Sequence, residues 1–185
     1  LPRTHPDNTN KSHSPTAHFI SGGTGADRQT ARPGDKCVVG LDVGSTTTKA
    51  VLMRQADNAI LASIYLRTNG DPVGASKQCY AAIYDQVLKA CDPEHLQIEG
   101  LGVTGSGRKV AGLHGLTKGV INEIIAHSTA AVYFDPEVDT IFEIGGQDSK
   151  YISIDNGVVV DFEMNHACAA GTGSFLEEQA EKLGI

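Results

Sequence analysis

Two short stretches of the sequence share one arrangement of acidic, glycine, small polar and lysine residues. They are GLDVGSTTTKAV at residues 40–51 and IFEIGGQDSKYI at residues 141–152, with an offset of 101 residues. The matching positions are Asp42 with Glu143, Gly44 with Gly145, and Lys49 with Lys150. Internal self-similarity of this kind predicts a duplicated unit whose two copies face one shared ligand.

The residues at each tip are suited to holding the phosphates of a nucleotide. Glycines allow backbone N–H groups to approach phosphate oxygens, and hydroxyl side chains add further donors. A lysine supplies positive charge to phosphate oxygens. The predicted phosphate-binding residues are Gly44, Ser45, Thr46, Thr47 and Lys49 on the first tip, and Gly145, Gly146, Gln147 and Asp148 on the second.

The acidic residues at the tips predict a metal ion. Asp42 and Glu143 would repel bare phosphates, so we expect them to bind Mg²⁺ through water. Gln147 and Asp148 are placed to orient an attacking water, as positioning residues do in phosphoryl transfer. The predicted catalytic residues are therefore Asp42, Glu143 and Gln147. An alternative stays open, in which both stretches are hairpin turns that need glycine for turn geometry alone.

A single cysteine is the third candidate for chemistry. Cys168 lies in NHACAAGTGSFLEEQAEKLG, residues 165–184, directly before an expected helix. Backbone N–H groups and the helix dipole favour a thiolate at such a position. A buried small hydrophobic residue is the alternative for a lone cysteine. The other cysteines, Cys37, Cys79 and Cys91, form no CxxC pair, so their spacing predicts neither a zinc site nor a disulfide lattice.

Hydrophobic periodicity predicts the elements that must position these residues. The expected strands are 37–43, 48–53, 59–66 and 97–104, followed by 139–146, 147–154 and 157–164. The expected helices are 71–91, 122–134 and about 169–183. The first helix has Asp71 to cap it and Pro72 at its first position. Its predicted apolar face consists of Tyr80, Ile83, Tyr84, Val87, Leu88 and Cys91.

Composition sets a tail apart from these elements, and the restart of the strand pattern after the second helix divides them into two units. Residues 1–35 are rich in Pro, Ser, Thr, Asn, Gly and His, which is typical of a flexible tail or linker. Units are expected at 36–138 and 139–185. A formal net charge of −7, with scattered Lys and Arg, argues against nucleic acid or an anionic membrane as partner. No signal peptide and no membrane span are recognisable, so a cytoplasmic location is expected. The ends of the sequence suggest a fragment of a longer protein.

Three blocks of the sequence resemble a known family. GLDVGSTTTK resembles the phosphate-1 hairpin of the actin, sugar-kinase and heat-shock-chaperone ATPase superfamily. FEIGGQDSK and MNHACAAGTGSFLE resemble one branch of it, the BadF/BadG/BcrA/BcrD type. That branch comprises activators of 2-hydroxyacyl-CoA dehydratases and ATPase subunits of benzoyl-CoA reductases. VTGSGR at residues 103–108 fits the same branch, as do Glu123 and His127, which we interpret as a helix-face pair.

The resemblance implies a fold and a set of ligands. The implied fold is a duplicated ribonuclease-H-like α/β fold, with the first subdomain and the start of the second present in this chain. Gly171, Thr172 and Gly173 are included among the nucleotide-binding residues. Cys168 would be one of two cysteines per subunit that ligate a [4Fe–4S] cluster shared by a homodimer. The second cysteine is expected after Ile185.

The resemblance also implies an activity. ATP hydrolysis to ADP, with Mg²⁺, is expected to drive one low-potential electron into a partner dehydratase or reductase. A ferredoxin or flavodoxin-type protein would be the electron donor. Two alternatives stay open: a small-molecule kinase of the same superfamily, which would have no use for Cys168, and a nucleotide-sensing module without hydrolysis. The 185 residues alone are expected to bind nucleotide poorly and to be inactive.

Overall fold

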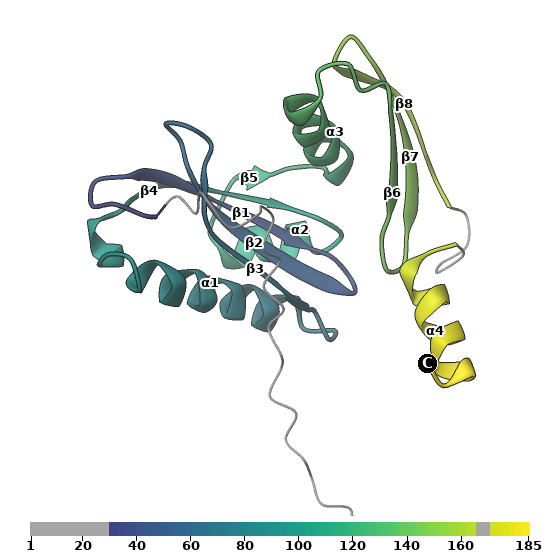
Figure 1. The fold of residues 1–185 in the computed structure, drawn as a ribbon, viewed down its shortest axis with the longest axis horizontal. Helices are drawn as coiled ribbons and strands as arrows, with labels where there is room; N and C mark the ends of the chain where they lie inside the picture. The colour runs from purple at the N-terminus through teal and green to yellow at the C-terminus, as the bar shows by residue number, and fades with distance from the viewer. Residues whose placement is uncertain (1–29, 166–170) are drawn as a thin grey trace, which may run out of the picture.

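The computed structural model describes residues 30–165 and 171–185, which form two sheets with four helices around them (Figure 1). A flexible tail was predicted at residues 1–35. Residues 1–29 lie outside the described part of the chain. From there on the chain packs with the first unit, since Ala31 is buried and Gly34 N donates to His95 O at 2.8 Å.

The first sheet has the strand order β3-β2-β1-β4-β5. Its first three strands pair antiparallel, and the last two run parallel to β1. Their bounds are β1 Lys36–Val43, β2 Thr47–Arg54, β3 Ile60–Arg67, β4 Gln97–Thr104 and β5 Gly119–Val120. The first four strands agree with the predicted ranges to within one or two residues, whereas β5 was not expected.

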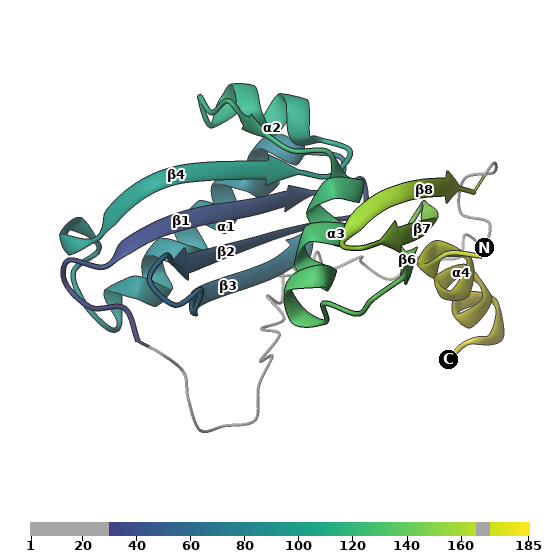
Figure 2. The same ribbon diagram turned by 90° about the horizontal axis from the view of Figure 1, so that it is seen from above.

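Helix α1 (Pro72–Leu88) covers one face of this sheet (Figure 2). Asp71 caps it by accepting a hydrogen bond from Gly74 N at 2.8 Å, and Pro72 takes the first position, as predicted. The predicted apolar face is partly wrong, because Tyr84 and Leu88 are 51% and 54% exposed. The row that faces the sheet follows i, i+4 spacing instead, which places residues one above another on a helix. Its members are Ala75, Cys79, Ile83 and Val87.

Shorter helices follow the first helix along the chain. A 3₁₀ turn spans Pro93–His95, and α2 spans Arg108–His114 directly after the glycine-rich TGSGR loop. Helix α3 spans Glu123–Phe134 and begins at the predicted place, because Asn122 accepts a hydrogen bond from Ile124 N at 2.9 Å. Within the described parts of the chain, no helix has the length and apolar character needed to cross a membrane.

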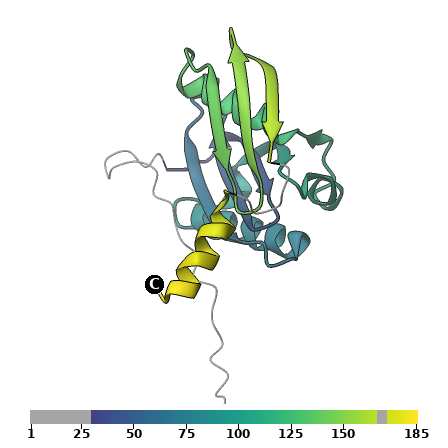
Figure 3. The ribbon, with the colours of Figure 1, turned by 90° about the vertical axis from the view of Figure 1, so that its right-hand side faces the viewer.

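The second sheet has the order β6-β7-β8 and is antiparallel throughout. Its strands are β6 Thr140–Ile144, β7 Ser149–Asp155 and β8 Val158–Met164. Ile152 and Ile154 of β7 form a small core with Ile124 of α3. Helix α4 (Gly173–Leu183) extends from the end of this sheet (Figure 3) and begins four residues later than predicted. Cys168 lies in the gap at 166–170, outside the described residues.

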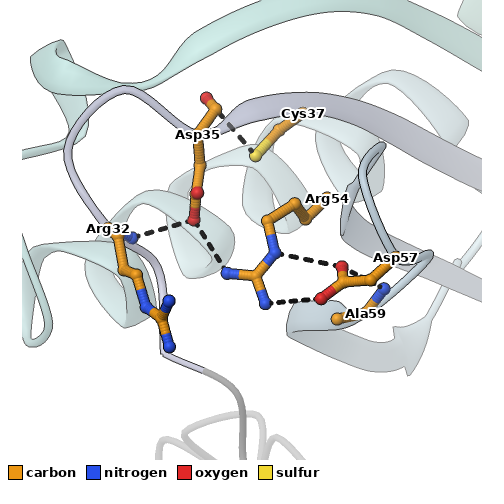
Figure 4. A network of polar contacts seen from close by, with 6 residues as sticks. All are labelled: Arg32, Asp35, Cys37, Arg54, Asp57 and Ala59. Atoms are coloured by element: carbon orange, nitrogen blue, oxygen red, sulfur yellow. Dashed lines mark hydrogen bonds and ion pairs between the residues drawn. The ribbon is translucent and has the colours of Figure 1, made fainter.

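A buried arginine secures the first hairpin at the end opposite its turn (Figure 4). Arg54 Nε and Nη2 donate to the two carboxylate oxygens of Asp57 at 3.0 and 2.9 Å, and Nη1 donates to Asp35 Oδ2 at 3.0 Å. These hydrogen bonds raise the pKa of Arg54, and the one from Arg54 lowers the pKa of Asp57. Because a strand slip of one residue would turn every side chain to the other face, fixing this end helps to preserve the register at the far turn.

Candidate functional site

The hairpin of β1 and β2 places the first acidic residue opposite the first lysine. Asp42 and Lys49 are register partners, and Lys49 Nζ donates to Asp42 Oδ2 at 3.0 Å. Gly44 N donates to Thr47 O at 2.9 Å and closes the turn. The side chains of Lys49 and Asp42 are 38% and 32% exposed, so both remain accessible to a ligand.

The hairpin of β6 and β7 repeats this geometry. Glu143 and Lys150 are register partners, and Lys150 Nζ donates to Glu143 Oε2 at 2.8 Å. Gly145 N donates to Asp148 O at 2.8 Å, which is the same turn hydrogen bond at the same offset. The self-similarity of the sequence therefore corresponds to two hairpins with equivalent backbone geometry.

The two turns line one cleft. Every predicted residue of both hairpins contributes to it: Asp42, Gly44, Ser45, Thr46, Thr47, Lys49, Glu143, Gly145, Gly146, Gln147 and Asp148. The turns approach each other so closely that a Cβ added at Gly146 would lie 2.5 Å from Thr46 Oγ1. The cavity measures about 70 Å³, well below the roughly 300 Å³ of a typical pocket for a whole ligand. It can surround phosphate groups but not an entire nucleotide.

Three further residues that were predicted to bind the nucleotide do not line the cleft. They are Gly171, Thr172 and Gly173. Thr172 is fully buried and donates from Oγ1 to Gly146 O at 3.0 Å, and Gly173 N donates to Gly145 O at 2.9 Å. Gly171 has a φ of 68° and no neighbour within 4 Å of an added Cβ. The described geometry gives Thr172 and Gly173 a role in holding the turn.

The cleft also contains residues that the sequence analysis did not assign to it. These are Gly105, Ser106, Glu123, His127 and Lys150. Glu123 and His127 had been interpreted as a helix-face pair, but the face they share is a wall of the cleft. Their four-residue spacing, which puts both side chains on one face of a helix, was the sequence feature that could have indicated a shared place in the cleft. Gly105 has a φ of 88°, and an added Cβ would meet Asp42 Oδ1 and Val43 O, so glycine is required there.

Carboxylates outnumber ammonium groups around the cleft. Asp42, Glu123, Glu143 and Asp148 face the lysines Lys49 and Lys150. Burial lowers the pKa of Lys150, but the hydrogen bond to Glu143 and the surrounding negative charges raise it more, so its pKa lies above the usual value. Because the excess charge is negative, phosphates need an accompanying cation to enter.

The donor set fits Mg²⁺ held through water. Among the described residues, no three His, Cys, Asp or Glu side chains gather closely enough to hold a metal directly. Mg²⁺ commonly keeps several waters and takes one or two carboxylates together with substrate phosphates. Asp42 and Glu143, one on each hairpin, would supply those carboxylates.

Two of the described cysteines, Cys37 and Cys79, are poorly suited to ligate a cluster. Cys37 and Cys79 are fully buried, and burial raises the pKa of both thiols, that of Cys79 to about 11. A cluster ligand must be a thiolate, so burial of this kind disfavours it.

Comparison with known proteins identifies related chains. The sequence model of the BadF/BadG/BcrA/BcrD ATPase family matches residues 39–185. A curated relative, the (R)-2-hydroxyglutaryl-CoA dehydratase activating ATPase of Acidaminococcus fermentans, is 33% identical over 150 residues, which are 80% of this chain and 54% of that protein. The chain thus spans about half the length of the curated relatives it matches.

Solved structures agree with the sequence comparison. Component A of the A. fermentans (R)-2-hydroxyglutaryl-CoA dehydratase superposes with a TM-score of 0.68 and 30% identity, over 80% of this chain and 54% of that one. The activator of the 2-hydroxyisocaproyl-CoA dehydratase from Clostridium difficile, with bound ADPNP, has a TM-score of 0.67 and 32% identity, over 80% and 53%. These similarities confirm the predicted fold class.

Proposed function

The chain belongs to the BadF/BadG/BcrA/BcrD ATPase family, and we propose that the protein containing it hydrolyses ATP between the two hairpins. The observation that carries this proposal is the pairing of two turns, each beside a lysine and a carboxylate, around one cleft. The ADPNP bound by the C. difficile activator supports it.

Each part of the cleft has a role in this proposal. Turn N–H groups, the hydroxyls of the first turn and Lys49 bind phosphate oxygens. Mg²⁺, held by Asp42 and Glu143 through water, would neutralise charge on the transferred phosphoryl group. Gln147 Nε2 donates to Ser174 Oγ at 3.0 Å, which fixes the amide and leaves its oxygen to accept a hydrogen bond from the attacking water. Asp148 lies beside it and completes the placement of that water.

The proposed role of ATP hydrolysis is activation of a partner enzyme. Relatives are named as activators of 2-hydroxyacyl-CoA dehydratases and as a benzoyl-CoA reductase subunit. We place the acyl-CoA chemistry in such a partner and give this protein the delivery of a low-potential electron. A ferredoxin or flavodoxin-type protein would supply that electron.

A [4Fe–4S] cluster is the proposed carrier of the electron. Cys168, together with a second cysteine from the rest of the protein, would ligate the cluster in each subunit of a homodimer. Four thiolates are the usual ligand set, and a twofold axis supplies them as two from each subunit. The unsuitability of Cys37 and Cys79 supports the choice of Cys168.

Iron content and ATP turnover test the two halves of this proposal together. The complete protein is purified without oxygen as wild type, Cys168→Ser and Asp42→Asn, with Cys91→Ser as a matched thiol control. We expect about two irons per chain in the wild type and the control, and their loss in Cys168→Ser. Asp42→Asn should keep the iron and lose ATP hydrolysis.

Other outcomes would point to other functions. No iron in any variant, with ATP turnover intact, would overturn the electron-transfer role and favour a small-molecule kinase. Nucleotide binding without turnover in the wild type would favour a sensing module.

A further inference from the structure

The two lysines at matching positions of the duplicated hairpins have different surroundings. The Lys49 side chain is 38% exposed, has one carboxylate partner and lies 5.6 Å from the centre of the Tyr65 ring. The Lys150 side chain is 5% exposed and has two carboxylate partners, Glu143 at 2.8 Å and Glu123 at 3.7 Å. An exposed ammonium can turn to a phosphate, whereas a buried one cannot leave its partners without leaving charges unpaired. Matching positions therefore do not imply matching roles.

The second partner of Lys150 comes from another part of the fold. Glu123 is the first residue of α3, whereas Lys150 and Glu143 lie on neighbouring strands of the second sheet. The ion pair thus joins the start of α3 to the second sheet, on which α3 also packs through Ile124, at the wall of the cleft. Its length of 3.7 Å exceeds that of a hydrogen bond, so Glu123 acts on Lys150 through charge and the contact has room to shorten.

Lys150 in turn fixes the orientation of Glu143. It donates to Oε2, while Oε1 lies on the side of the turn, where a Cβ added at Gly145 would come within 3.2 Å of it. The Glu143 side chain is 19% exposed, so most of it is shielded from water. One oxygen of Glu143 is therefore held for Lys150 and the other is left for the cleft.

We propose that Lys49 is the phosphate-binding lysine of this site, whereas Lys150 and Glu123 are positioning residues that hold Glu143 in place. The proposal rests on the proposed ATPase function. Loss of a phosphate-binding lysine weakens nucleotide binding. Loss of a positioning group leaves binding in place and lowers the rate of the chemical step.

Steady-state kinetics of the complete protein separate these roles. The variants are Lys49→Met, Lys150→Met and Glu123→Gln, with Lys36→Met as the matched control, because Lys36 pairs with Glu99 at 3.5 Å on the surface. The measured quantities are kcat, KM for ATP, and the Mg²⁺ concentration that gives half-maximal activity.

We expect a clear division between the variants. Lys49→Met should raise KM for ATP about tenfold or more, since it removes a charge-assisted contact to phosphate. Lys150→Met should lower kcat about 10- to 100-fold and raise the Mg²⁺ requirement, with KM little changed, because a carboxylate displaced by 1 Å can have such an effect. Glu123→Gln should act in the same direction but less, and Glu123→Asp should recover part of the loss.

Specific results would overturn the proposal. If Lys150→Met raises KM as Lys49→Met does, Lys150 is a phosphate ligand. If Glu123→Gln behaves as Lys36→Met does, Glu123 has no positioning role. If Lys150→Met fails to fold, Lys150→Arg keeps the charge and should retain KM while lowering kcat; an unchanged kcat would contradict the role.

Failure of the ATPase proposal is recognised separately. In that case the wild type itself turns over no ATP, and the affinity for ADPNP replaces the kinetic readout. Lys49→Met alone should then weaken ADPNP binding, and equal weakening in Lys150→Met would refute the assignment of the lysines.

Discussion

Adding one methyl group between the two turns is the most direct test of the cleft. Gly146 on the second turn faces Thr46 on the first, and an alanine Cβ at position 146 would lie 2.5 Å from Thr46 Oγ1, 2.8 Å from its Cβ and 3.0 Å from its Cγ2. Gly146 is not among the residues with positive φ, so the backbone itself accepts alanine. The whole effect of Gly146→Ala must come from the contact across the cleft.

The size of the effect follows from these distances. Favourable separations between non-bonded heavy atoms begin near 3.5 Å, so one turn must move by about 1 Å. A misplacement of about 1 Å can cost about 100-fold in rate, which corresponds to roughly 2.7 kcal/mol. We therefore expect kcat/KM for ATP in the complete protein to fall about 100-fold, with little change in Tm. Gly100→Ala is the matched control, because an added Cβ at Gly100 has no neighbour within 4 Å.

A second substitution shows whether the two turns truly oppose each other. Thr46→Gly removes the atoms that the new methyl group would meet, although it also removes a hydroxyl proposed to bind phosphate. Gly146→Ala should therefore be less harmful in the Thr46→Gly background than in the wild type, a coupling that a double-mutant cycle measures. Additive effects of the two substitutions, or normal activity of Gly146→Ala alone, would refute the close approach of the turns.

Three further predictions concern the scaffold. Leu52→Ala should lower the free energy of unfolding, measured by urea denaturation, by about 2–5 kcal/mol, because the Leu52 side chain is 1% exposed. Ile98→Ala is the control: Ile98 is 55% exposed, so the free energy of unfolding should change by less than about 0.5 kcal/mol. Arg54→Met should lower Tm, because Asp57 then loses the two hydrogen bonds that Arg54 donates to it. An unchanged Tm would show that the Arg54–Asp57 pair does not contribute to stability. Burial raises the pKa of Cys79 from its usual 9.0 to about 11, so its contribution to stability is complete below pH 9 and is lost as the pH rises through 11. The difference in urea midpoint between wild type and Cys79→Ala should shrink over that interval, and a constant difference would contradict it.

The hairpins could be predicted because all their determinants are local. Each turn contains glycine at a fixed distance from an acidic residue and a lysine, and pairing across a short hairpin follows from that spacing alone. The start of α1 is similar, since Asp71 and Pro72 signal it within two residues. The repetition of the motif, which is also a property of the sequence, predicted that the two turns face each other, and both do line one cleft.

Contacts between distant elements could not be predicted in this way. Nothing near Lys150 indicates that its second carboxylate partner comes from α3, 27 residues earlier in the chain. Periodicity also assigned Tyr84 and Leu88 to the core, because apolar type alone does not fix how far a helix rotates against its sheet. Strand β5 has only 2 residues, which is too short a run to be recognised as a strand from hydrophobicity.

Each turn has a carbonyl oxygen that accepts a hydrogen bond from a buried threonine, although the two threonines do not lie at matching positions of the duplication. Backbone turns expose carbonyl oxygens as well as N–H groups, and carbonyls repel phosphate. In the first hairpin Thr68, 3% exposed, donates from Oγ1 to Gly44 O at 2.8 Å. In the second, Thr172 donates to Gly146 O, and backbone N–H groups at the start of α4 donate to Gly145 O and Gly146 O. These carbonyl oxygens are thus already paired within the protein, which would reduce their repulsion of a phosphate placed in the cleft. The two threonines lie 24 and 26 residues from the glycines they contact, which is why the hairpin motif alone indicated neither contact.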